Sequence, residues 1–141
     1  MPSYAIQLAQ DLVRCPSVTP AEGGALDLMQ DELSKLGFDC TRLPFGTGVA
    51  RIDNLFARRG ISGPHFAFAG HIDVVPVGDL EKWQHDPFSG VVRDGKLFGR
   101  GAADMKGGVA AFVAAVAEFI QHTPNSGSIS LIITGDEEAD A

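Results

Sequence analysis

Three groups of histidine and carboxylate side chains are the part of this sequence best suited to chemistry. They are His71 and Asp73 after "FAFAG", Asp104 in "GRGAADMKGG", and Asp136, Glu137 and Glu138 after "SISLIIT". Histidine nitrogen and carboxylate oxygen are ligands for zinc and similar divalent ions. A free carboxylate beside such ions can take a proton from water. Together the three groups predict metal-assisted hydrolysis.

Each group has a plainer structural interpretation when it is considered alone. Alternate side chains of an extended segment share a face, so Asp73 can hydrogen-bond His71, but such pairs are more often satisfied polar pairs than metal sites. Asp104 stands between a glycine-rich turn and an apolar helix, where a carboxylate commonly caps the helix. Glu137 and Glu138 repel each other unless they are solvated or held by cations, as in an acidic loop after an edge strand. Only the combination favours a metal centre.

The spacing of the groups indicates how a fold could bring them together. Asp104 lies 31 residues after Asp73, and Glu137 lies 33 residues after Asp104. A strand, a crossover helix and a second strand need about 30 residues. We therefore expect one such unit in each interval, with all three groups at the C-terminal edge of a sheet.

Apolar periodicity predicts the elements that would position these groups. Helices are expected at residues 5–12 and 26–36, and a largely buried helix at 109–120. Strands are expected at 38–44, 54–60, 65–70 and 128–134, of which 65–70 should be a central strand covered on both faces. Asp94-Gly95 predicts a tight hairpin within 90–101, outside the main sheet. The order indicates an α/β fold, with a mixed, largely parallel sheet flanked by helices.

Length and composition narrow the class of protein. The chain has 141 residues, of which 45% are hydrophobic, and a formal net charge of −7. This length suits one globular domain. The negative charge opposes binding to nucleic acid or anionic membranes. Cys15 and Cys40 form no zinc-finger or disulfide pattern, and neither a signal peptide nor an apolar span of about 18 residues is recognised, so we expect a cytoplasmic protein.

One long stretch of the sequence resembles a known family. "GHIDVVPVGDLEKWQHDPFSGVVRDGKLFGRGAADMKGG" followed by "GDEE" is similar to the co-catalytic metallohydrolases, which include aminoacylase, acetylornithine deacetylase and dipeptidases. The likeness runs from about residue 4 to the last residue. It implies a catalytic domain of the zinc-exopeptidase type, two divalent metal ions (zinc, with cobalt as an alternative), and an N-acyl amino acid as substrate.

The resemblance also implies roles for individual residues. His71 would bind one metal ion, Asp104 would bridge both, and Glu138 would bind the other. Asp73 would orient His71. Glu137 would be the general base that takes a proton from the attacking water and passes it to the leaving amine. The Asp104–Met105 peptide bond would be cis.

The same resemblance implies that residues 1–141 are the N-terminal portion of a longer catalytic domain. A further acidic ligand, a histidine ligand, the rest of the sheet and the domain through which these enzymes form homodimers would follow Ala141. Ala139 replaces the family's usual glycine, which removes no ligand. We expect the isolated chain to bind metal weakly and to lack activity, because an open ligand set holds no ion in a defined geometry.

Several other residues stay outside the predicted site. His65, His122 and Trp83 are expected to have structural or packing roles, and Arg100 and Lys106 are left unassigned. A non-catalytic remnant that kept the fold is the alternative from a different class of protein. The intact Glu137 speaks against it, because a purely structural metal site needs no free base.

Overall fold

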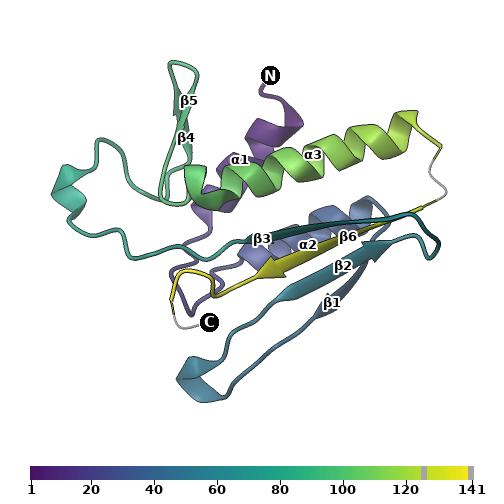
Figure 1. The fold of residues 1–141 in the computed structure, drawn as a ribbon. Coiled ribbons are helices and arrows are strands. Elements are labelled where there is room, and N and C mark those ends of the chain that lie inside the picture. The colour runs from purple at the N-terminus through teal and green to yellow at the C-terminus, as the bar shows by residue number, and fades with distance from the viewer. Residues whose placement is uncertain (125–126, 140–141) are drawn as a thin grey trace.

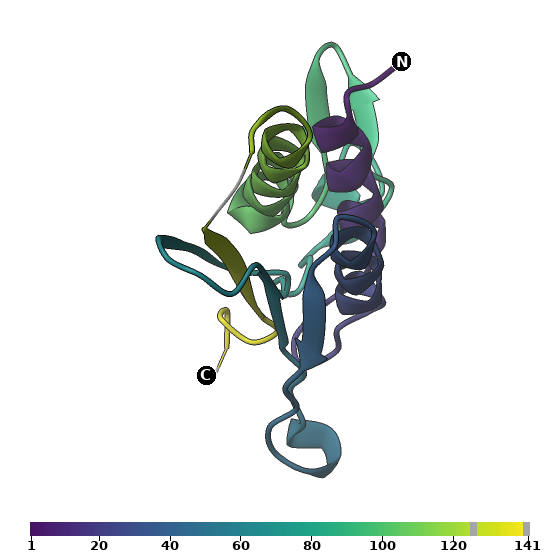
Figure 2. The ribbon, with the colours of Figure 1, turned by 90° about the vertical axis from the view of Figure 1, so that its right-hand side faces the viewer.

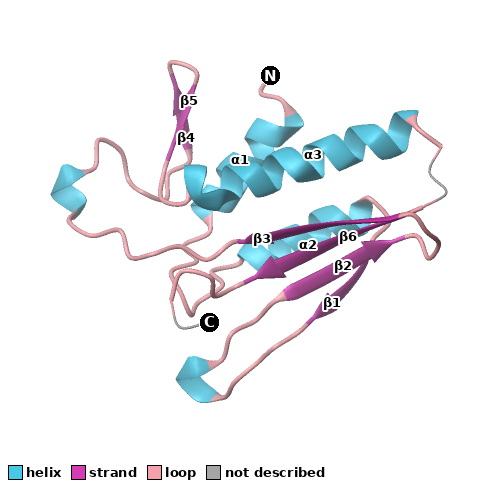
Figure 3. Ribbon diagram, in the orientation of Figure 1, coloured by secondary structure: helices cyan, strands magenta, loops and turns pink. Residues whose placement is uncertain are grey.

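The computed structural model describes residues 1–124 and 127–139 (Figures 1 and 3). Its helices are α1 (Tyr4–Arg14), α2 (Ala25–Lys35) and α3 (Gly107–His122), and its strands are β1 (Asp39–Arg42), β2 (Leu55–Arg59), β3 (His65–His71), β4 (Val91–Arg93), β5 (Lys96–Phe98) and β6 (Ser128–Thr134). Short helical turns are η1 (Gly48–Ala50), η2 (Leu80–Lys82) and η3 (Ala102–Lys106). Every helix and strand expected from the sequence is present among them.

The main sheet is mixed, as predicted, with the strand order β1-β2-β6-β3. The β3–β6 pair is parallel, whereas β1–β2 and β2–β6 are antiparallel, so the sheet of the described residues is not largely parallel. Strand β1 returns to β2 through a hairpin-like loop, which reverses the chain and forces antiparallel pairing. This loop extends away from the sheet (Figure 2).

Strand β3 is an edge strand of the described sheet and not its centre. It pairs only with β6, and Phe66 on its core side is 62% exposed. The continuous apolar run "FAFAG" predicted burial on both faces, but apolar content alone does not reveal how many neighbours a strand has. The central strand next to β3 is instead β6, in which Leu131 and Ile133 are fully buried.

Helix α3 is buried on one face rather than largely buried. Val109 and Val113 are fully buried, whereas Phe119 is 42% exposed. The helix has apolar residues on nearly every side, but only the side facing the sheet and α1 is covered. Sequence hydrophobicity therefore overestimated the burial of this helix.

The interval between Asp73 and Asp104 contains no strand of the main sheet. It holds η2 and the β4–β5 hairpin, which turns at Asp94-Gly95 as predicted and forms a separate two-stranded sheet (Figure 1). Both turn residues have positive φ, 50° and 72°, which matches a type I′ turn. One crossover thus joins β3 to β6 where two were expected, and Asp104 lies just before α3 rather than after a strand.

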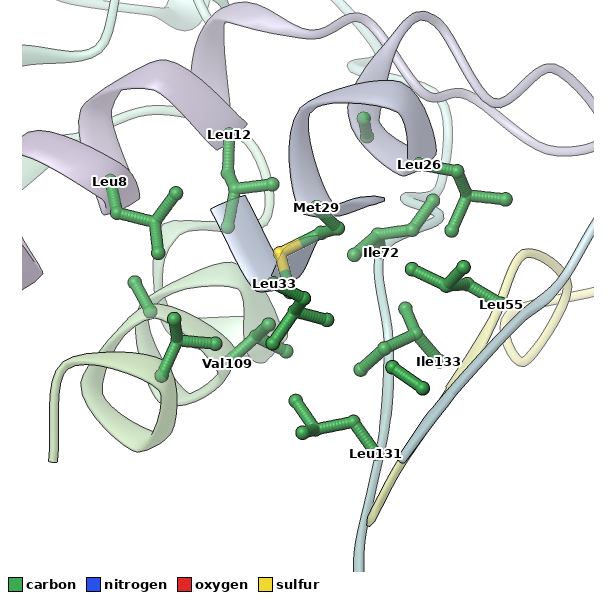
Figure 4. Close-up of a cluster of buried hydrophobic side chains, with 14 of the residues drawn as sticks. Leu8, Leu12, Leu26, Met29, Leu33, Leu55, Ile72, Val109, Leu131 and Ile133 are labelled. Atoms are coloured by element: carbon green, nitrogen blue, oxygen red, sulfur yellow. The ribbon is translucent and has the colours of Figure 1, made fainter. Parts of the chain in front are cut away.

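The hydrophobic core joins the three helices to one face of the main sheet (Figure 4). Its members come from every layer: Leu8, Leu12, Leu26, Met29, Leu33, Leu55, Ile72, Val109, Leu131 and Ile133. Leu8 and Leu12 lie one turn apart on α1, and Met29 and Leu33 do the same on α2, so each helix buries one apolar stripe. Among the described residues, no helix is both long and apolar enough to cross a membrane.

Candidate metal centre

Parallel pairing of β3 with β6 places two of the predicted groups at one edge of the sheet. His71, the last residue of β3, pairs with Thr134, the last residue of β6. The Ile72 N–H donates to the Thr134 carbonyl at 3.1 Å, which continues the ladder one residue past β3. The segments that carry Asp73 and Glu137 therefore leave the sheet side by side.

Asp104 reaches the same edge from the opposite direction, through the turn that precedes α3. Its backbone is extended (φ −122°, ψ 97°) inside η3, so the helix proper begins only at Gly107. The Asp104–Met105 peptide bond is cis, as the family resemblance implied. The side chain of Asp104 is 75% exposed and contacts His71, the last residue of β3.

These elements bring three predicted metal ligands together. One ligand atom from each of His71, Asp104 and Glu138 lies within 4.8 Å of the other two. His71 is buried, Glu138 is half-buried and Asp104 is exposed, so the group opens to solvent on one side. One imidazole nitrogen and two carboxylates are a donor set that suits a divalent ion such as zinc. The residues present therefore fit the metal that the sequence predicted.

His71 presents its Nε2 atom to the acidic groups. Its Nδ1 lies 3.1 Å from the backbone carbonyl of Asp73, and because a carbonyl only accepts, Nδ1 carries a proton. Nε2 then lies 3.1 Å from Asp104 Oδ1 and 3.6 Å from Glu137 Oε2. Burial lowers the pKa of His71, but the hydrogen bonds to Asp73 and Asp104 and the nearby carboxylate charges outweigh it and raise the pKa above its ordinary value.

The carboxylate of Asp73 mainly holds the acidic loop after β6. It is fully buried and accepts the Glu137 N–H at 3.0 Å and the Glu138 N–H at 2.9 Å. Its Oδ1 is 3.4 Å from His71 Nδ1, so the ring is held chiefly by the carbonyl of residue 73. The sequence predicted that Asp73 orients His71, but it gave no sign of this second attachment.

Glu137, the predicted general base, lies beside the group of three predicted ligands. Its side chain is 58% exposed and reaches toward His71, while its backbone is fixed by Asp73. It is not one of the three residues that form the ligand group. A carboxylate held beside metal ligands and open to solvent can accept a proton from water.

The residues left outside the predicted site have other partners. Lys106 is fully buried and donates to the Cys15 carbonyl at 2.8 Å, and Arg100 lies over the ring of Trp83 with its Cζ 5.1 Å from the ring centroid. His65 contacts Ser128 and Ser130, and His122 contacts the Glu118 carbonyl. These contacts match the structural and packing roles expected for the two histidines and Trp83.

A cavity of about 760 Å³ adjoins the acidic loop. Its lining includes Thr19, Phe45, Asn54, Thr134 and Asp136. Cavities of this size accept small molecules. Sequence patterns gave no sign of it, because its walls come from segments more than 100 residues apart in the chain.

The cluster lies within the part of the chain that matches a known protein family. The model of peptidase family M20/M25/M40 matches residues 67–141, which contain all of the predicted ligands, and the chain belongs to this family. The family is metal-dependent, in agreement with the donor set described above.

Two similar proteins within this family carry the same name. The chain is 63% identical over 138 residues to succinyl-diaminopimelate desuccinylase of Rhodospirillum centenum, covering 96% of this chain and 36% of that protein. It is 59% identical over 143 residues to the enzyme of the same name from Cereibacter sphaeroides, covering 100% of this chain and 37% of that protein. The chain thus spans little more than a third of the length of these relatives.

Solved structures share the fold. Human carnosine dipeptidase 1 matches with a TM-score of 0.81 and 27% identity, over 93% of this chain and 31% of its own. An M20 family metallo-carboxypeptidase from Sulfolobus solfataricus matches with a TM-score of 0.85 and 21% identity, over 97% of this chain and 32% of its own. The α/β fold with a mixed sheet is therefore the fold of this family.

Proposed function

We propose that residues 1–141 are the N-terminal portion of the catalytic domain of a longer enzyme, which hydrolyses N-succinyl-LL-2,6-diaminopimelate to succinate and LL-2,6-diaminopimelate. This would be a step of diaminopimelate and lysine synthesis in the cytoplasm. The observation that carries the proposal is 63% identity to a succinyl-diaminopimelate desuccinylase across nearly the whole chain. The grouping of His71, Asp104 and Glu138 supports it, because the ligands remain together at the sheet edge.

The proposed site divides its work among five residues. His71, Asp104 and Glu138 would hold two divalent ions, zinc or cobalt, with Asp104 between them. Such ions polarise an amide carbonyl and make water more acidic. Glu137 accepts the proton from the attacking water and transfers it to the leaving amine nitrogen. Asp73 keeps the ring of His71 and the backbone of residues 137–138 in place.

The remaining ligands, the rest of the substrate site and a homodimer interface belong, in this proposal, to the part of the protein that the chain does not contain. One histidine and two carboxylates leave coordination positions open for two ions. We therefore expect the 141-residue chain to bind zinc weakly and to hydrolyse no amide substrate. Amide hydrolysis by the purified chain, free of any longer enzyme, would contradict this expectation.

A second candidate is hydrolysis of a different amide by the same metal centre. The fold match to a dipeptidase at 27% identity favours keeping this candidate, because one metal group can serve several amide substrates. Acetylornithine deacetylase activity belongs to the same alternative.

Turnover by the complete protein separates these candidates. The measurement compares the initial rates on N-succinyl-diaminopimelate, N-acetylornithine and an unmodified dipeptide, each with zinc present. We expect the succinylated substrate to have the highest kcat/KM. A higher kcat/KM on N-acetylornithine or on the dipeptide would show that the proposed substrate is wrong. If the zinc-loaded protein hydrolyses none of the three, the proposal that it is an amide hydrolase is refuted.

A further inference from the structure

The segment Cys15–Thr19 supplies none of the predicted ligands, yet it contacts every segment that does. It directly follows α1. Ser17 is fully buried and its hydroxyl donates to the Ile72 carbonyl at 2.5 Å. The Val74 N–H donates to the Ser17 carbonyl at 2.9 Å, and Val18 forms a parallel bridge with Val74. The segment thus lies beside residues 72–74, directly after the ligand His71.

The same segment also contacts the turn that carries Asp104. Lys106 is the last residue of that turn, and its buried ammonium group donates to the Cys15 carbonyl at 2.8 Å. The Lys106 N–H donates to the Gly101 carbonyl at 2.9 Å, which closes the turn around Asp104. The exposed Asp104 side chain is therefore attached to a backbone that is anchored to residue 15.

Thr19 completes the set by reaching the acidic loop. Its hydroxyl donates to Asp136 Oδ1 at 2.8 Å, and its backbone N–H donates to the Val74 carbonyl at 3.3 Å. Asp136 is only 8% exposed and directly precedes Glu137 and Glu138. One threonine therefore joins the segment after β3 to the loop after β6, which are otherwise joined by the hydrogen bonds of Asp73.

We propose that Thr19 is a positioning residue of the metal centre: by holding Asp136 it fixes the direction in which the backbone presents Glu137 and Glu138. This inference rests on the proposed metal-dependent function, which it deepens. The Asp73 carboxylate accepts the backbone N–H groups of Glu137 and Glu138. The Thr19 hydroxyl donates to the side chain of the preceding residue, Asp136. The backbone of the loop is also held at its start, where the Gly135 N–H donates to Asn54 Oδ1 at 3.1 Å and the Asp136 N–H donates to Thr134 Oγ1 at 3.2 Å. Thr19 adds to these backbone contacts a hydrogen bond to the Asp136 side chain. Groups that hold ligands in place commonly contribute about 10- to 100-fold in metal affinity.

The test compares Thr19→Val, which has nearly the same shape but no hydroxyl, with Thr19→Ser, which keeps the hydroxyl. Tyr4→Phe is the matched control, since it also removes one side-chain hydrogen bond to a carboxylate, that of Glu32, on the far part of α1 and α2. The first measurement is amide hydrogen exchange at Glu137 and Glu138 in the metal-free chain. The second is the zinc affinity of the complete protein, measured by titration calorimetry. Both measurements are made well below the unfolding temperature.

We expect exchange at these two amides to accelerate about tenfold in Thr19→Val, and zinc affinity to fall by about the same factor. Thr19→Ser should resemble the unchanged chain, and Tyr4→Phe should alter neither measurement. Unchanged exchange in Thr19→Val, or equal changes in Thr19→Val and Tyr4→Phe, would overturn the inference. If the complete protein binds no zinc at all, the proposed metal function fails, while the exchange measurement still decides the role of Thr19.

Discussion

The carboxylate of Asp73 accepts the backbone N–H of Glu138 at 2.9 Å, across 65 residues of sequence. The Glu137 N–H donates to both oxygens of the same carboxylate, at 3.1 Å and 3.0 Å. The residue that follows His71 by two positions thus holds the loop that carries both the proposed base and a proposed ligand. Charge-assisted hydrogen bonds of this kind are about twice as strong as neutral ones.

Replacing Asp73 with Asn should therefore lower both the zinc affinity and the stability of the fold. The amide keeps the size of the side chain, but it removes the charge and one of the two accepting oxygens. We expect zinc affinity to fall by about 10- to 100-fold, with a loss of roughly 1–3 kcal/mol in the free energy of unfolding. Calorimetric titration and urea unfolding measure the two effects.

Asp79→Asn is the control for that substitution. Asp79 also accepts a backbone N–H, from Glu81 at 3.1 Å, but it does so on an exposed turn. It should leave zinc affinity unchanged. Equal losses of affinity in the two variants would show that Asp73 has no specific role at the centre.

Glu137→Gln should separate proton transfer from metal binding in the complete enzyme. The substitution preserves size and the backbone hydrogen bond to Asp73 but leaves no carboxylate to accept a proton. We expect turnover to fall by about 10²- to 10⁴-fold with the zinc content unchanged. Glu138→Gln should instead lower zinc affinity. Normal turnover in Glu137→Gln would refute the proposed base.

Zinc should stabilise the chain through the group that contains Asp104. A ligand that binds only the folded state raises the free energy of unfolding by about 2.7 kcal/mol when its free concentration is roughly 100 times the dissociation constant. A chelator should reverse this stabilisation. Asp104→Ala should abolish most of this effect without lowering the stability of the metal-free chain, because the side chain is 75% exposed. Thermal unfolding with and without zinc measures the shift.

Glu81→Ala is the control for Asp104→Ala, since it also removes an exposed carboxylate from a short helical turn. It should keep the full zinc-dependent shift. A shift that survives in Asp104→Ala would place the bound zinc elsewhere on the chain.

A pH effect is expected far from the metal centre, where α1 meets α2. Burial raises the pKa of the Glu32 carboxyl, but hydrogen bonds from Lys35 and Tyr4 outweigh it and hold the pKa below its ordinary value of 4.5. Because the folded state binds this proton less readily than the unfolded state, the resulting stability is present above pH 4.5 and is lost as the pH falls through the folded pKa.

Tyr4→Phe removes one of the two hydrogen bonds that lower this pKa. It should cost about 1 kcal/mol at pH 7, and its difference from the unchanged chain should shrink as the pH falls below 4.5. Urea unfolding at several pH values checks this. A difference that stays constant from pH 7 to pH 3 would contradict the assignment.

The residue types at the site and the elements that carry them follow from the sequence. Apolar periodicity marks where β3 and β6 end. The order of residues also shows that His71 lies at the end of one strand and that Glu137 follows the other. The start of α3 within "DMKGG" is equally local, as is the turn at Asp94-Gly95. Each depends on side chains within one or two turns of the chain, so the sequence determines them by itself.

Only the tertiary structure decided how these strands, helices and loops lie relative to one another. Whether β3 is central or at an edge depends on which strands pair with it, and the single crossover between β3 and β6 replaced the two that residue spacing suggested. The partners of Asp73, at residues 137 and 138, and the partner of Thr19, at residue 136, lie 64 to 117 positions away. No local pattern encodes such contacts. They exist only once the apolar faces of α1, α2 and α3 have packed on the sheet and brought together the segments that follow α1, β3 and β6.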